Sequence, residues 1–357
     1  MNGYDYGNAR IRARRSRMLT LNDYSDLLSV ETIERLLGAL ADTVYGSDLQ
    51  AAMLRFSGLR CLDEAVRSHL ARHLRMLETF FDGPERSRLE LLLHRWDLRN
   101  LRTILRGRVR LEGSEQIVRL LVPAGTIDEA ALIELASQPS LRATVELMMA
   151  WNLPTAGTAG RMMAAWPEFE ATNDPSVFEG TLNRAYADHL HSSLSGGPRD
   201  ELARILRLEI DQTNLVTALR LRSARLEAEP GWDVGDPSAH YLSAGRIPVD
   251  SLESVRLAET PGDAARLLQD APLLPTWTAA VAEWAVNDDL LRLSASLEAA
   301  MAQEAVGLFA KGDPLGIAIP VAFAWAKESE ARNLRLIGRG VVHAIPPDVV
   351  EQELIAS

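Results

Sequence analysis

The stretch Asp97-Leu98-Arg99-Asn100-Leu101-Arg102-Thr103-Ile104-Leu105-Arg106 recurs, with substitutions, four times in this chain of 357 residues. Every copy has an acidic residue, an Asn three positions later and an Arg six positions after the Asn. The other copies are Asp211…Asn214…Arg220, Glu330…Asn333…Arg339 and, in a weaker form, Asp5…Asn8…Arg14. An internal repeat of this kind indicates that the chain is built from similar units.

The motif has the pattern of an amphipathic helix. Leu101 follows the Asn and Ile104 lies four residues beyond it, so both fall on one helical stripe. The acid and the Arg are nine residues apart, which at about 100° per residue places them on opposite sides of the helix. They therefore cannot pair with each other. Asn is a mediocre helix former, and its recurrence in register predicts a buried hydrogen bond between helices.

The segments around the motif repeat in the same order. An apolar residue followed by an acid opens a long helix before each motif helix, at Leu62, Phe178 and Leu297. From this residue to the motif Asn there are 38 residues in the first copy and 36 in the other two. Such regularity is hard to obtain by chance. The motif Asn residues recur 92, 114 and 119 positions apart, far beyond the period of about 20 to 50 residues of common solenoids, so the pattern predicts three large helical modules. The predicted modules are 1–120, 121–240 and 241–357.

Two connectors of similar sequence follow the first two motif helices. Leu121-Val122-Pro123-Ala124-Gly125-Thr126-Ile127 leads into a predicted helix at 128–136. Leu242-Ser243-Ala244-Gly245-Arg246-Ile247 leads into a predicted helix at 252–258. The two ends of the chain fit this order loosely, because apolar segments also follow the first and last motif copies.

Breaks between helices are marked by Gly and Pro. Asp82-Gly83-Pro84 predicts that one helix stops and another starts, and Gly196-Gly197-Pro198 is its counterpart in the second module. The segment 20–26 is interpreted as a break with capping residues. Two further stretches, 153–175 and 228–248, are rich in Gly, Pro, Asp and Ser and are expected to be irregular connectors.

Composition favours an all-α protein. Leu, Ala and Arg dominate, β-branched and aromatic residues are sparse, and no stretch shows sustained alternation of apolar and polar residues. A net charge of −11 argues against nucleic acid as a partner. Cys61 is the single cysteine, which excludes an intrachain disulfide and favours a reducing compartment. The longest apolar run lies between Asp313 and Lys327 and is shorter than the roughly 20 residues of a membrane span, so no transmembrane segment is expected.

Nucleotide-binding motifs are not found. A phosphate-binding loop of the Walker type needs Lys followed by Ser or Thr, whereas Lys311 precedes Gly312 and Lys327 precedes Glu328. The Gly-rich segment 155–161 has no predicted strand before it and is interpreted as a flexible loop. These observations argue against P-loop hydrolysis.

Metal and nucleophile patterns are equally weak. His69 and His73 stand four residues apart, which can place two imidazoles on one helix face, but no third ligand follows, and a solvated face flanked by arginines is the preferred interpretation. The segment 287–292 lacks the further Asp that a magnesium site of an isoprenoid synthase needs. Cys61 has no evident base partner and is interpreted as a small buried hydrophobe. We therefore predict no catalytic, cofactor-binding or metal-ligating residues.

Five segments, in order along the chain, resemble one family. This chain resembles, over essentially its whole length, the C subunit of V/A-type ATP synthases, which is related to the d subunit of the vacuolar ATPase. The departures are at 154–175 and 231–236. The segments that carry the resemblance are Tyr4-Asp5-Tyr6-Gly7-Asn8-Ala9-Arg10-Ile11-Arg12, Val44-Tyr45-Gly46, Arg95-Trp96-Asp97-Leu98-Arg99-Asn100-Leu101-Arg102, Lys327-Glu328-Ser329-Glu330-Ala331-Arg332-Asn333-Leu334-Arg335 and Ile345-Pro346-Pro347.

The resemblance implies a funnel-shaped, all-helical protein with three similar modules around a pseudo-threefold axis. It implies a non-catalytic rotor subunit without cofactors, a socket that couples the central shaft subunits of the D and F types to the membrane proteolipid ring for proton or sodium transport. Such a subunit would be cytoplasmic and peripheral on the cytoplasmic face of the membrane. Two alternatives remain open: a cytosolic helical-repeat scaffold that binds a protein partner, and an all-α enzyme with an unrecognised site.

Overall fold

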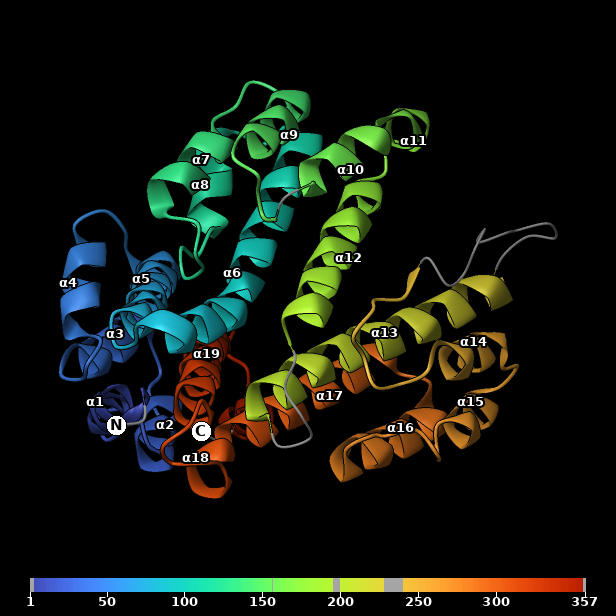
Figure 1. Cartoon of the computed structure of the whole chain (residues 1–357). Coiled ribbons are helices and arrows are strands. Elements are labelled where there is room, and N and C mark those ends of the chain that lie inside the picture. Colours follow the sequence, from blue (N-terminus) through green and yellow to red (C-terminus); the bar gives the residue numbers. More distant parts are fainter. Residues whose placement is uncertain (1–2, 156, 195–199, 228–239, 356–357) are drawn as a thin grey trace. The chain divides into compact units, whose positions relative to one another are not determined.

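The computed structural model describes residues 3–155, 157–194, 200–227 and 240–355 (Figure 1). Helix accounts for 75% of the structure, and the described residues contain no strand, so the predicted all-α class is confirmed. None of the described helices is long and apolar enough to cross a membrane. The helices are α1 (Asp5–Arg15), α2 (Leu21–Leu28), α3 (Ile33–Ala41), α4 (Gly46–Met53), α5 (Gly58–Glu78), α6 (Gly83–Val109), α7 (Ser114–Leu120), α8 (Glu129–Ala136), α9 (Leu141–Ala150), α10 (Thr158–Ala164), α11 (Trp166–Thr172), α12 (Ser176–Ser193), α13 (Glu201–Glu227), α14 (Val249–Leu257), α15 (Pro261–Leu267), α16 (Pro275–Asn287), α17 (Leu290–Val306), α18 (Leu308–Lys311), α19 (Ala318–Val342) and α20 (Pro347–Gln352).

The chain forms two compact units. The first unit comprises Met1–Gly107, Glu112–Ser137 and Ala302–Ser357, so it contains both the beginning and the end of the chain. The second unit comprises Arg108–Leu111 and Gln138–Met301. The first motif copy and the last therefore lie in one unit, and the second copy lies in the other.

Helix α19 is the central element of the first unit. It packs against α5, α1, α2, α3, α18 and α20, and Figure 1 shows it, in red, among the blue helices of the N-terminal part. Its first nine residues, 318–326, are apolar and all buried, as expected for a helix segment that is apolar all round. This is the long apolar run of the sequence. Pro320 lies in the first turn of the helix, where no backbone donor is lost.

The second unit is assembled from neighbouring helices. Helix α13 packs against α14, α14 against α15, and α15 against α16, while α10 contacts α9, α11 and α12. Trp277 on α16 is completely buried, and its indole Nε1 donates a hydrogen bond to the carbonyl of Leu297, at 3.0 Å. Side-chain caps from Ser140 and Thr260 start helices α9 and α15.

Several boundaries differ from the prediction. The expected break at 20–26 is wrong, because Thr20 and Asp23 form a capping box that starts α2 at Leu21. The irregular connector expected at 153–175 contains α10 and α11, and the flexible loop expected at 155–161 runs into α10 at Thr158. The break at 82–84 is confirmed. The break expected at 196–198 and the segment 231–236 lie outside the described residues.

Candidate functional site

Each of the three strong motif copies binds the backbone of a connector through its Asn. In the first copy, Nδ2 of Asn100 donates to the carbonyl of Val122 at 2.7 Å, and the amide of Val122 donates to Oδ1 at 2.9 Å. The side-chain amide thus satisfies both backbone groups of a single residue. We use the term connector contact for this pair of hydrogen bonds together with the hydrogen bonds that the acidic residue of the same motif copy accepts from backbone amides outside its helix.

The same geometry recurs in the other two copies. Asn214 pairs with both backbone groups of Leu242, at 3.0 and 2.8 Å. Asn333 pairs with both backbone groups of Ile355, at 2.8 and 3.0 Å. The three motif Asn side chains are at most 1% exposed. The predicted buried hydrogen bond is therefore present in all three, but its partner is an irregular connector or the C-terminal segment, not a helix.

The motif acids bind the same connectors a few residues further on. The carboxylate of Asp97 accepts from the amide and the hydroxyl of Thr126, at 2.9 and 2.8 Å, and from the amide of Ile127 at 2.9 Å. Asp211 accepts from the amides of Arg246 and Ile247, at 2.5 and 3.0 Å, and from Nε of Arg246 at 2.8 Å. Ile127 and Ile247 each lie two residues before the next helix, so the acid binds the connector just before that helix begins.

A glycine is required where the connector passes the acid. A Cβ atom on Gly125 would lie 2.0 Å from Oδ1 of Asp97, and one on Gly245 would lie 2.8 Å from Oδ1 of Asp211. Any larger residue would displace the carboxylate from its hydrogen bonds. The two glycines occupy the same position in the two similar connector sequences. This shared glycine is the feature of the sequence from which the close approach of the acid could have been predicted.

The third connector contact uses both ends of the chain. Asn333 binds Ile355 near the C-terminus, whereas Oε2 of Glu330 accepts from the amide of Leu19 at 2.9 Å. Leu19 lies two residues before α2, as Ile127 and Ile247 lie two residues before α8 and α14. The N-terminal segment thus supplies to Glu330 a backbone donor of the kind that the connectors supply to Asp97 and Asp211.

The weak fourth copy behaves differently. Nδ2 of Asn8 donates to the carbonyls of Pro314 and Gly316, at 3.1 and 2.9 Å, in the turn before α19. It therefore holds the start of the central helix and does not form a connector contact. The arginines of the three strong copies are all exposed, on the opposite side from the buried acids.

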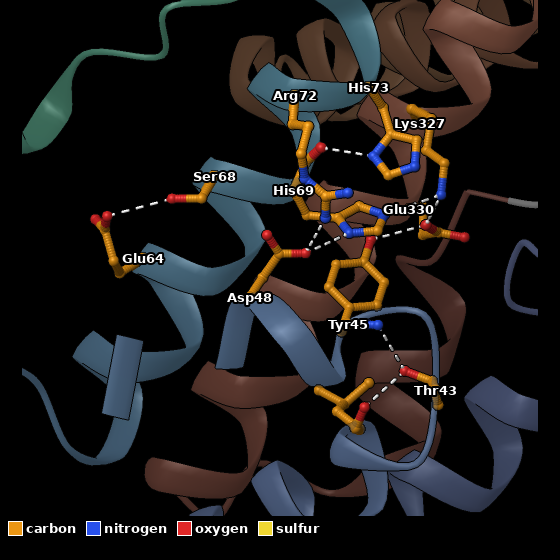
Figure 2. Close-up of polar contacts among 11 residues, drawn as sticks. Thr43, Tyr45, Asp48, Glu64, Ser68, His69, Arg72, His73, Lys327 and Glu330 are labelled. Atoms are coloured by element: carbon orange, nitrogen blue, oxygen red, sulfur yellow. Dashed lines mark hydrogen bonds and ion pairs between the residues drawn. The ribbon is translucent and has the colours of Figure 1, made fainter. Parts of the chain in front are cut away.

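A buried polar network surrounds the third connector contact (Figure 2). Nζ of Lys327 lies 2.6 Å from Oε1 of Glu330, and the hydroxyl of Tyr45 donates to the same oxygen at 2.7 Å. Lys327, Glu330 and Tyr45 are at most 3% exposed. Glu330 thus joins α19, the turn before α4 and the N-terminal segment at Leu19.

His69 extends the network to α4. Its Nδ1 donates to Oδ2 of Asp48 at 2.9 Å, so the neutral ring presents Nε2 as an acceptor to Nζ of Lys327, at 3.3 Å. The ring is stacked between those of Tyr45 and His73, with centroid distances of 4.0 Å on both sides. Arg72 donates to the same Asp48 oxygen at 2.5 Å. Figure 2 shows these side chains converging from α4, α5 and α19.

The environment keeps both histidines neutral. Burial lowers the pKa of His69, an effect that the hydrogen bond to Asp48 opposes and the charge of Lys327 reinforces. Burial, with His69 and Lys327, lowers the pKa of His73 to about 3. Burial and the adjacent Glu330 raise the pKa of Tyr45 well above its usual value. At neutral pH the cluster therefore contains neutral rings between fixed charges.

The structure contradicts the prediction for the two histidines and agrees with that for Cys61. The solvated face expected for His69 and His73 is wrong: His69 is 1% exposed, and Nδ1 of His73 donates to the carbonyl of His69 at 2.8 Å. Cys61 is a buried free thiol, as interpreted, and burial raises its pKa. Within the described ranges, no three or more His, Cys, Asp or Glu side chains are grouped so as to hold a metal.

The chemistry of this arrangement is structural. Both ring nitrogens of His69 are engaged, and the carboxylate of Glu330 accepts from three donors. Hydrogen bonds of this kind position helices and connectors, and a fully connected buried network specifies one packing.

Comparisons with known proteins identify the family. The family described as "ATP synthase (C/AC39) subunit" matches residues 7–353. The C subunit of the V-type ATP synthase of Thermus thermophilus is 28% identical, over 99% of this chain and 98% of its own length. The C subunit of the A-type ATP synthase of Haloferax volcanii is 26% identical, over 98% and 97%. Its V-type counterpart in Deinococcus radiodurans is 26% identical, over 99% and 91%. The chain therefore belongs to the ATP synthase (C/AC39) subunit family.

Proposed function

We propose that this protein is a non-catalytic central-stalk subunit of a V/A-type rotary ATPase, which couples the central shaft to the membrane proteolipid ring. The observation that carries the proposal is the threefold recurrence of the connector contact on a chain that belongs to this family. A coupling part has to transmit torque, so it needs stiff joints rather than a reaction centre.

The connector contacts supply such joints. In the first two copies, a motif helix and the connector behind it are held by an Asn that binds one connector residue and an acid that binds the residues four and five positions further along. Two anchor points separated along the connector resist rotation of the next helix better than one. The buried Lys327–Glu330 contact helps to fix the position of the Glu330 carboxylate in the third contact.

We further propose that three modules, 1–120, 121–240 and 241–357, are arranged around a pseudo-threefold axis as a funnel. The support is that the three contacts are equivalent in chemistry and register, and that the third is completed by the N-terminal segment at Leu19. A repeat whose last unit binds the beginning of the first closes on itself. In this arrangement the protein is peripheral on the cytoplasmic face of the membrane, with shaft subunits of the D and F types on one side and the ring on the other.

Reconstituted vesicles test the proposal. Complexes that lack this protein should retain ATP hydrolysis in the head while ATP-driven pumping of protons or sodium ions is lost, and adding the purified protein back should restore pumping. Equal pumping with and without the protein would overturn the coupling function. It would instead support a helical scaffold that binds some other protein.

A further inference from the structure

The first unit contains an arginine-rich pocket of about 440 Å³. Six arginines and two carboxylates, Asp63 and Glu64, line it, in a chain whose net charge is −11. The arginines come from four helices that the sequence does not place together: α5, α6, α7 and α19. Volumes of about 300 to 1,000 Å³ are typical of sites for small molecules. The arginines are Arg60, Arg67, Arg99, Arg119, Arg335 and Arg339.

Half of these arginines have no carboxylate partner. Arg60, Arg99 and Arg339 form no ion pair within the part of the chain that the structure describes. Arg99 lies over the ring of Trp96, with 4.5 Å from its Cζ to the ring centroid, and Arg60 lies over Phe56, at 5.5 Å. These contacts orient the guanidinium groups without neutralising them.

Each of the remaining three arginines pairs with a carboxylate, and Arg119 does so with Glu115. Arg67 donates to both oxygens of Glu64, at 3.0 and 2.7 Å, and to the carbonyl of Leu121 at 3.0 Å. Arg335 lies 3.6 Å from Asp63 and its side chain is 29% exposed. Burial lowers the pKa of Arg335; the carboxylate of Asp63 opposes this shift, and the positive charges of Arg339 and Arg99 reinforce it. Cations held this close together repel one another, and a bound anion would relieve that repulsion.

We propose that this pocket binds a small oxyanion with two or more neighbouring phosphate groups. Guanidinium groups match phosphate oxygens with two parallel hydrogen bonds, and the unpaired Arg99 and Arg339 face the same pocket. The phosphates belong either to a free polyphosphate in solution or to the headgroup of an anionic lipid. The pocket also includes Val122, which is bound by Asn100, so the anion lies beside the first connector contact. This binding requires only the pocket residues and holds whether or not the protein is the proposed coupler.

Titration of the purified full chain tests the free-anion source. Inorganic tripolyphosphate, followed by calorimetry at low salt, should bind at one site per chain, and binding should weaken as salt is raised. Arg99→Gln and Arg339→Gln should each weaken it about tenfold, as expected for the loss of a charged hydrogen bond. Both arginines are largely solvent-facing, so the variants should keep the circular dichroism and melting behaviour of the wild type.

Arg220→Gln is the matched control. Arg220 occupies in the second motif copy the position of Arg339 in the third, it is exposed, and it does not line this pocket. Tripolyphosphate affinity should be unchanged in Arg220→Gln. An equal loss in this control would show that only overall charge matters, and wild-type affinity in both pocket variants would also overturn the proposal.

Flotation with vesicles tests the lipid source. Vesicles of phosphatidylcholine that contain phosphatidylinositol 4,5-bisphosphate, whose headgroup carries two neighbouring phosphate groups, are compared with vesicles of phosphatidylcholine alone, with the wild type, Arg99→Gln/Arg339→Gln and Arg220→Gln. Flotation with the anionic vesicles that the double variant loses and the control keeps would assign the phosphates to a lipid headgroup. Binding of tripolyphosphate without flotation would assign them to a free anion. Absence of both, or an acidic peptide binding where neither phosphate source does, would overturn the proposal.

Discussion

Nζ of Lys327 and Oε1 of Glu330 lie 2.6 Å apart, in a place where both side chains are at most 3% exposed. Removing two charges from water costs several kcal/mol, so such a pair is a poor source of net stability. Its value here is specificity, because Glu330 can reach the amide of Leu19, the hydroxyl of Tyr45 and Lys327 in only one packing of the first unit.

Removing one partner of this pair should lower the stability more than replacing both partners. Lys327→Met leaves the carboxylate of Glu330 buried without its cation and should lower the free energy of unfolding by about 3–5 kcal/mol. In Lys327→Met/Glu330→Gln the loss should be smaller than the sum of the two single losses. Chemical denaturation of the four proteins measures this coupling.

Lys311→Met is the control for this cycle. Lys311 is the only other lysine of the chain and is exposed, so its replacement should change stability by less than about 0.5 kcal/mol. Strictly additive effects of Lys327→Met and Glu330→Gln would contradict the assignment of a coupled buried pair.

Loss of one motif Asn should loosen one connector. Asn214→Leu leaves both backbone groups of Leu242 without their partner, at a cost of about 1–3 kcal/mol. Urea unfolding should report the loss, while Asn22→Leu, at an exposed position on α2, should be nearly neutral. If the protein is the proposed coupler, complexes with Asn214→Leu should hydrolyse ATP normally and pump less. An unfolding curve like that of the wild type would refute the importance of this contact.

The connector glycine should not tolerate a methyl group. Gly125→Ala places Cβ 2.0 Å from Oδ1 of Asp97, so the carboxylate must leave the amides of Thr126 and Ile127. Overpacking of this kind costs about 1–3 kcal/mol. Gly38→Ala on α3 meets nothing within 4 Å and should instead stabilise the protein by about 0.5–1 kcal/mol. Thermal unfolding of both variants should show shifts of opposite sign, and two shifts of the same sign would contradict the prediction.

Acid should destabilise the first unit through its histidines. The pKa of His73 is lowered to about 3 in the folded protein, whereas it is about 6.5 in an unfolded chain. Between these pH values the unfolded state binds more protons than the folded state. The contribution of His73 to the free energy of unfolding is therefore fully present above about pH 6.5 and is lost as the pH falls toward 3. The slope is at most about 1.4 kcal/mol per pH unit for each proton.

Urea unfolding between pH 7.5 and 4.5 measures this dependence. His73→Gln removes one of the titrating rings and should flatten the curve. His343→Gln, which changes an exposed histidine at the end of α19, should leave the slope as it is. A variant at His73 with the wild-type slope would show that another group is responsible.

Local chemistry in the sequence was enough to predict the long helices that carry the motif and the register of the motif in them, although α2, α10 and α11 were not predicted. Helix propensity, apolar periodicity and the break at Gly83 act over a few residues, so they can be read directly. The recurrence of Asn in a helix likewise indicated burial, because an exposed position would not favour it.

The partners of those residues were decided by tertiary structure. Asn100 and Asn214 bind connector residues 22 and 28 positions away, and connectors have no periodicity that would pair them with a helix face. His69 resembled a solvated residue because its own helix supplies arginines around it, while the groups that bury it include Lys327, 258 positions away.

The third connector contact shows most clearly which features follow from the sequence and which depend on the tertiary structure. The sequence determined that Glu330 and Asn333 form a motif like those at Asp97 and Asp211, and that the motif needs backbone groups to bind. It did not indicate which backbone groups those are for Glu330. The fold supplies the amide of Leu19, 311 positions away, because a buried carboxylate must find donors and packing alone decides which donors come within reach.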